Sequence, residues 1–81
     1  MIQFKGGDGS GKNEAIIILG PNNEREGVDA EYDYIERKFG DFEIESQTFI
    51  DDGDKQYDMM NISYALNEKK KELWFDISDF Y

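Results

Sequence analysis

The chain has 81 residues and contains no histidine and no cysteine, and its 9 basic residues against 19 acidic ones give a formal net charge of -10. These absences exclude an imidazole base, a thiolate nucleophile, a disulfide framework and cysteine-type zinc sites, so we expect no enzyme activity, no cofactor and no metal. With 38% hydrophobic and 15% aromatic residues, positions 1–81 should form a single small globular domain.

The charge is concentrated in the middle of the chain. Residues 24–58 carry 13 acidic and 4 basic side chains, whereas the rest of the chain is nearly neutral. Such a surface repels phosphate groups, so we expect no direct binding of nucleic acid. The longest apolar run, residues 15–19, is much shorter than the roughly 20 residues that cross a bilayer. We therefore expect no membrane contact and a soluble, cytoplasmic protein.

The first 19 residues predict a β-hairpin. Residues 2–5 alternate between apolar and polar side chains, as in a short strand. Residues 15–19 form an apolar run rich in β-branched isoleucine, which Gly20 and Pro21 end. Between the two segments, four glycines within residues 6–12 indicate a loop.

A helix is predicted over residues 24–39. Asn22 or Asn23 supplies an N-cap, and Glu26 stands three residues after Asn23, where its carboxylate can reach back to the cap amide. Gly40 supplies the C-terminal stop, whereas Gly27 weakens the first turn by about 1 kcal/mol. Apolar side chains at spacings of four, three and four residues should form the face that packs on the core: Val28, Tyr32, Ile35 and Phe39.

Three further strands are predicted after the helix. The first covers residues 42–50, with one face formed by Phe42, Ile44, Ser46, Thr48 and Ile50. An aspartate-rich turn at 51–54 leads to a strand over 56–66, and a polar connection at 67–71 leads to a last strand over 72–77. Short connections favour an antiparallel meander. The expected fold is an α+β two-layer sandwich in the order ββαβββ, with one amphipathic helix packed on a mainly antiparallel sheet.

The glycine-rich segment from Gly6 to Lys12 matches part of a phosphate-binding P-loop. The match fails at Asn13, because a P-loop needs a hydroxyl after the lysine and a helix behind the loop, and here a strand of isoleucines follows. A flexible hairpin loop is the simpler interpretation. One alternative stays open, in which the amides of Gly9 and Gly11 and the ammonium of Lys12 bind a small anion.

The predicted helix carries a stripe of carboxylates. On a helical wheel Asp29, Asp33 and Glu36 lie beside the predicted apolar face, and Glu31 lies on the opposite flank. Like charges at this spacing destabilise a helix by a few tenths of a kcal/mol per pair. Solubility alone accounts for such a stripe, and a basic partner protein would make use of it.

Two aromatic residues are predicted to lie off the packed faces. Tyr34 is outside the helical apolar stripe, and Trp74 faces away from its apolar neighbours in the last strand, so both are candidates for partner contacts. We therefore expect a non-enzymatic acidic protein-binding module that docks on a basic partner, as an inhibitor, an immunity-type neutraliser or a nucleic-acid mimic would. The alternatives are an oligomerising or anion-binding domain that uses the glycine loop, and an accessory protein without a dedicated site.

Overall fold

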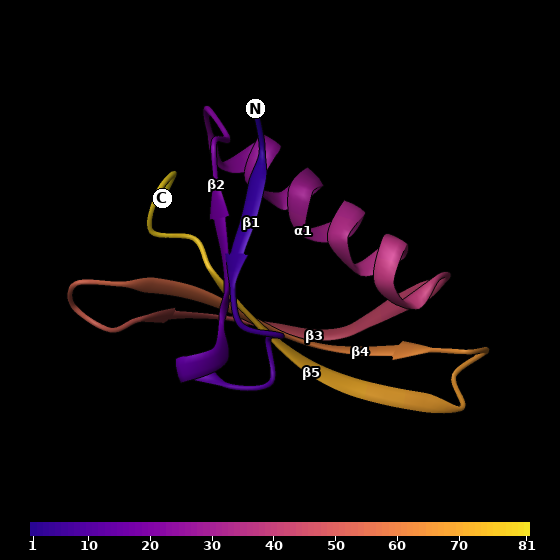
Figure 1. Ribbon diagram of the computed structural model, residues 1–81. Helices are drawn as coiled ribbons and strands as arrows, with labels where there is room; N and C mark the ends of the chain where they lie inside the picture. The colour runs from indigo at the N-terminus through magenta and orange to yellow at the C-terminus, as the bar shows by residue number, and fades with distance from the viewer.

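The computed structural model describes residues 1–81 and contains one sheet and one α-helix (Figure 1). Its elements in chain order are β1 (Gln3–Gly6), the 3-10 helix η1 (Lys12–Glu14), β2 (Ile16–Leu19), α1 (Glu24–Phe39), β3 (Phe42–Asp51), β4 (Gln56–Tyr64) and β5 (Lys69–Asp76). The five strands form a single sheet in the order β1-β2-β5-β4-β3. The predicted element order ββαβββ is confirmed.

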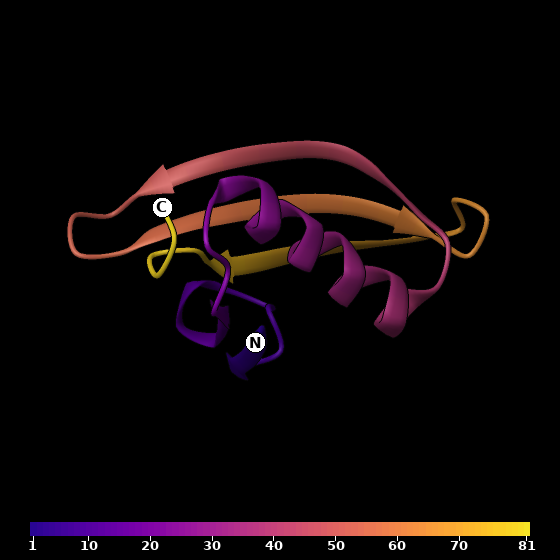
Figure 2. The ribbon, with the colours of Figure 1, turned by 90° about the horizontal axis from the view of Figure 1, so that it is seen from above.

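The helix covers one face of the sheet, as Figure 2 shows from above. Alternate positions of the strands and one side of α1 are apolar, so the two layers bury these side chains against each other. The largest apolar side chains of this core are Ile16, Ile18, Ile35, Met60, Ile62, Leu73 and Phe75. The predicted α+β two-layer sandwich is therefore confirmed.

The helix α1 has the predicted bounds and the predicted N-cap. The Asn23 side chain accepts a hydrogen bond from the backbone N–H of Glu26 at 2.9 Å. The Glu26 carboxylate was predicted to accept from the amide of the N-cap Asn23, but it accepts from the backbone N–H of Asn22 at 3.0 Å. At the other end Gly40 has a φ of 79°, which favours glycine, and donates its N–H to the Glu36 carbonyl. No helix in the structure has the length and apolar character needed to cross a bilayer.

The N-terminal hairpin joins the meander through a parallel pair of strands. β1 and β2 pair antiparallel, and β2 then pairs parallel with β5 over only two residue pairs. Figure 1 shows this hairpin standing steeply against the other three strands. Beyond the short parallel ladder, the backbone N–H of Trp74 donates to the Gly9 carbonyl at 2.8 Å, so the glycine loop continues the pairing along β5. This order places β1 at one edge of the sheet.

A β-bulge overturns the predicted alternation of β3. Ile44 and Ser46 pair with consecutive residues of β4, so Glu45 is an extra residue in the ladder. From Ser46 onward the side chains therefore change face, and those predicted to share the face of Ile44 point away from the helix. Phe49, predicted on the polar face, lies instead on the helix side, where it pairs with Asp58.

The connection between the last two strands is shorter than predicted. It comprises residues 65–68, and Lys69–Asp76 all belong to β5, which pairs antiparallel with β4. The turn holds Ala65, Leu66 and Asn67 at positive φ values of 54°, 57° and 68°. Leu66, predicted to continue the apolar face of the strand, is 95% exposed in this turn.

Candidate functional site

The carboxylates singled out on α1 lie on its solvent face. The buried residues of the helix are Gly27, Ala30, Glu31 and Ile35. On a helical wheel of about 100° per residue, the centre of this buried face is rotated by roughly 90° from the centre of the predicted apolar stripe. Asp29, Asp33 and Glu36, all exposed, therefore lie opposite the sheet and not beside the packed face as predicted.

A groove of about 420 Å³ runs between the start of β1 and α1, and we call it the β1–α1 groove. Its lining combines apolar and charged side chains: Ile2, Phe4, Ala30, Glu26, Asp29, Asp33 and Arg37. The structure thus brings Asp29 and Asp33 together with an apolar surface, whereas Glu36 lies outside the groove. Because β1 is an edge strand, the groove also borders a strand with pairing on one side only.

The charges of the β1–α1 groove are only partly compensated. The Asp33 carboxylate lies 3.0 Å from the Arg37 guanidinium one helical turn away, and both side chains are largely exposed, so this pair contributes little stability. Glu26 is engaged with Asn22 at the helix start. The Asp29 side chain is exposed and takes part in no hydrogen bond or ion pair within the protein. Three carboxylates and one guanidinium leave the groove negative.

The two aromatic candidates do not line this groove. Tyr34 packs against Phe4 and Phe75, with ring centroids 5.2 and 5.8 Å apart, so the prediction that Tyr34 lies off the packed face is wrong. Trp74 points away from the helix, as its strand position predicts, and packs edge-on against Tyr57 at 5.8 Å. Both rings are half-buried by neighbours within the protein.

Several polar groups of the glycine loop form hydrogen bonds or an ion pair within the protein. Gly9 is buried and donates its N–H to the Glu14 carbonyl at 2.7 Å, and the Gly11 carbonyl accepts from the Glu14 N–H. The Lys12 ammonium pairs with the Asp52 carboxylate from the β3–β4 turn, and this hydrogen bond raises the pKa of Lys12 above its usual value. None of the cavities is lined by these three anion-binding candidates. Lys12 therefore links the glycine loop to the β3–β4 turn, and its ammonium group is not a free cation.

A buried carboxyl pair, which was not predicted from the sequence, lies between α1 and β4. Glu31 is 0% exposed and Asp58 is nearly buried. As a carboxylate, Glu31 would have no hydrogen-bond donor at either oxygen. Burial, together with a hydrogen bond to Asp58 and the negative charge of Asp58, raises the pKa of Glu31 to about 10. Glu31 is therefore protonated at neutral pH.

Two sequence signals could have identified this pair. Glu31 follows Gly27 and Ala30 at spacings of four and one, and it precedes Ile35 by four, so it occupies the middle of a face of small and apolar residues. Asp58 is in step with the apolar positions of its strand, where the even-numbered residues face the core.

No family model, curated protein or solved structure matches this chain. Its function is therefore inferred from the chemistry of the surface. The β1–α1 groove offers uncompensated carboxylates next to apolar side chains, which is an environment suited to cationic groups that carry an apolar stem.

Proposed function

We propose that the protein is a non-enzymatic docking module that binds a basic segment of a partner protein in the β1–α1 groove. In this proposal Asp29 and Asp33 contact the partner directly. Glu36 adds to the negative field from outside the groove, and Tyr34 and Trp74 take no part. The module operates in the cytoplasm, and its partner presents lysine or arginine residues among apolar ones.

The observation that carries this proposal is the mixed lining of the groove. Lysine and arginine side chains bury an aliphatic stem and keep their charged end solvated, so one such side chain can contact Phe4 along its stem and Asp29 with its head. The net charge of -10 also attracts a basic partner over distance and raises the association rate. An extended partner segment can in addition pair with the backbone of an edge strand.

A peptide that alternates lysine and valine is a suitable probe, because it combines cationic heads with strand-forming apolar residues. We expect saturable binding in an NMR titration, with shifts at Phe4 and along the outer side of α1. The double variant Asp29→Asn/Asp33→Asn should bind about three- to tenfold more weakly, since each exposed charge contact contributes ~0.2 to 1 kcal/mol. Raising the salt concentration should weaken binding mainly by slowing association.

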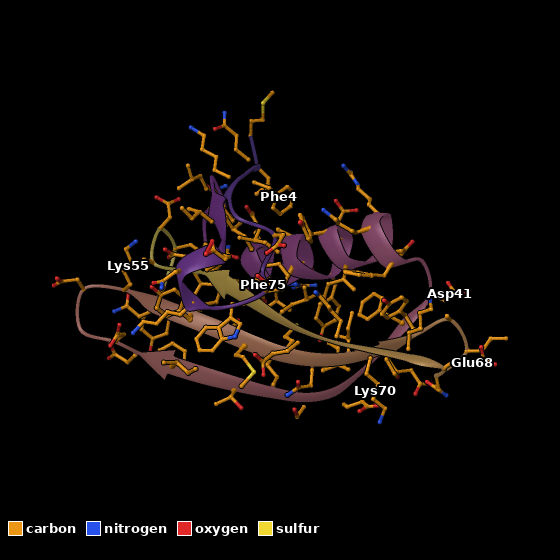
Figure 3. All side chains as sticks on the ribbon, turned by 60° about the horizontal axis from the view of Figure 1, so that its bottom comes forward. Phe4, Asp41, Lys55, Glu68, Lys70 and Phe75 are labelled. Atoms are coloured by element: carbon orange, nitrogen blue, oxygen red, sulfur yellow. The ribbon has the colours of Figure 1, made fainter.

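The matched control is the double variant Asp54→Asn/Glu68→Gln, which changes the net charge equally. Asp54 and Glu68 lie in the two hairpin turns, and Figure 3 shows Glu68 and Lys55, the residue after Asp54, at opposite ends of the sheet. This control should bind the peptide with nearly unchanged affinity. Equal weakening by both double variants would mean that only net charge matters, and the groove proposal would be wrong.

A further inference from the structure

A second cavity, of about 280 Å³, lies beneath the C-terminal segment, residues 77–81, and we call it the C-terminal cavity. The first half of α1, the end of β3 and the beginning of β4 complete its walls. Figure 2 shows the C-terminus beside the start of α1 and the end of β3. On the helix surface this cavity borders Glu24 and Val28, so it is separate from the β1–α1 groove.

Three aromatic side chains line the C-terminal cavity. The rings of Phe49 and Tyr81 stack with centroids 4.7 Å apart and an interplanar angle of 22°, although these residues are 44% and 59% exposed. Phe80 lies against the helix at Gly27, where the missing side chain leaves room for the ring. Aromatic faces carry partial negative charge, so a cavity with several such faces favours organic cations.

The charged side chains that line the cavity are all acidic. Asp58 lies in its lining and is nearly buried, and Glu24 contributes a second carboxylate from the start of α1. No lysine or arginine lines the cavity, and none forms an ion pair with Asp58 or Glu31. The fully buried Glu31 next to Asp58 is protonated at neutral pH, so it supplies no positive charge to offset Asp58. A nearly buried negative charge without a cationic partner is costly, and a bound cation would offset this cost.

We propose that the C-terminal cavity binds an alkylated ammonium group, with its charge toward Asp58 and its carbon atoms against the aromatic rings. The aliphatic side chains of Val28 and Ile77 complete the apolar surface for those carbon atoms. A hydrated metal ion fits the site less well, because calcium and magnesium need six or more oxygen ligands, and no three acidic residues cluster closely enough to supply them. This site does not depend on the proposed docking function.

The buried Glu31 should couple ammonium binding to proton release. Glu31 holds a proton in the free protein up to about pH 10, and Asp58 on β4 is the charged group that acts on it. Burial is the main cause of the raised pKa of Glu31, and the negative charge of Asp58 adds to it, so a cation bound beside Asp58 lowers the pKa of Glu31. By linkage, the affinity for a cation of fixed charge should then rise as the pH approaches about 10.

Tetramethylammonium is the probe that tests the site, because its charge does not change with pH. We expect saturable binding with a dissociation constant in the millimolar range, seen as NMR shifts of the Phe49, Phe80 and Tyr81 rings at constant ionic strength. Tert-butanol, which is similar in shape but neutral, and sodium chloride should each bind at least about tenfold more weakly. Equal shifts with tert-butanol or sodium, or shifts without saturation, would overturn the proposal.

Three variants locate the binding. Asp58→Asn removes the charge and should weaken tetramethylammonium binding about tenfold, whereas Asp54→Asn in the β3–β4 turn should leave it unchanged. Phe49→Leu keeps an apolar side chain but removes an exposed aromatic face, so it should weaken binding severalfold even if Asp58→Asn disturbs folding. Unchanged affinity in Phe49→Leu, with or without a folded Asp58→Asn variant, would rule out the aromatic site.

Two further measurements identify the source of the cation and the role of Glu31. A peptide with one Nε-trimethyllysine that binds more than tenfold tighter than tetramethylammonium would assign the site to a protein side chain, and equal affinities would assign it to a small free amine. Glu31→Gln should abolish the rise of tetramethylammonium affinity with pH. If the wild-type affinity stays flat to about pH 10, the coupling to Glu31 is wrong.

Discussion

Replacing Glu31 by glutamine should stabilise the protein by about 3 kcal/mol at pH 7. Glu31 is fully buried between α1 and β4, and its pKa rises from 4.5 to about 10 on folding. At pH 7 the unfolded chain carries an ionised Glu31 that must take up a proton to fold, which costs free energy. A glutamine amide needs no proton and can donate a hydrogen bond to Asp58 directly.

The pH dependence of this effect has a definite sign. Because the pKa of Glu31 is higher in the folded protein than in the unfolded chain, folding takes up a proton between these two values. The contribution of Glu31 to stability is therefore fully present below about pH 4.5, and it is lost as the pH rises toward about 10, by about 1.4 kcal/mol per pH unit. The advantage of Glu31→Gln should grow over the same range.

Urea unfolding of wild type and Glu31→Gln at several values between about pH 5 and pH 9 measures this difference. The net charge of -10 also makes stability depend on pH, through general repulsion between charges. Because the two proteins differ only at residue 31, comparing them at each pH cancels this general effect. Glu36→Gln, an exposed acid on the same helix, serves as the matched control and should show no comparable pH-dependent gain. A difference between Glu31→Gln and wild type that stays constant with pH would show that Glu31 is not held protonated.

Gly27→Ala should destabilise the protein by about 1 to 2 kcal/mol, although alanine is the better helix former by about 1 kcal/mol. A Cβ atom at this position would overlap the ring of Phe80, which lies directly on the helix backbone there. Because Phe80 lies after β5 in a segment that belongs to no helix or strand, the added methyl group should displace this segment rather than distort α1. The free energy of unfolding, measured with urea, should fall accordingly.

The same substitution should reverse its sign once Phe80 is removed. In a Phe80→Ala background, Gly27→Ala keeps only its helix-forming advantage and should stabilise the protein by about 1 kcal/mol. The double-mutant cycle should therefore give a coupling free energy of about 2 to 3 kcal/mol. Tyr81→Ala is the matched control, because Tyr81 stacks on Phe49 and does not lie on Gly27, so Gly27→Ala should remain destabilising in that background. Additive effects of the Gly27 and Phe80 substitutions would show that the ring does not occupy this position.

Local patterns in the sequence determined the secondary structure well. The helix from Glu24 to Phe39 has the predicted bounds, because a capping asparagine and a terminal glycine are interactions within a few residues of chain. The antiparallel meander follows in the same way from short connections between alternating segments. The carboxylates Asp29 and Asp33 were also correctly expected on the surface, since their exposure depends mainly on their type and spacing.

Only the tertiary structure decided which helix face is buried and what surrounds the two cavities. Glu31 is buried because the sheet packs against the side of α1 that carries Gly27 and Ala30, and small residues allow a closer approach than the predicted stripe does. Phe49 faces the helix because a bulge at Glu45 inserts one residue into the ladder, and no local pattern marks that insertion.

The positions of Phe80 and Tyr81 could not be predicted from local patterns either. The sequence places two aromatic residues after the last strand, but their position over Gly27 and Phe49 depends on contacts between segments more than 30 residues apart. The parallel pairing of β2 with β5 is equally distant in sequence. Periodicity and capping describe a residue and its near neighbours along the chain, whereas these contacts are set by how the layers pack.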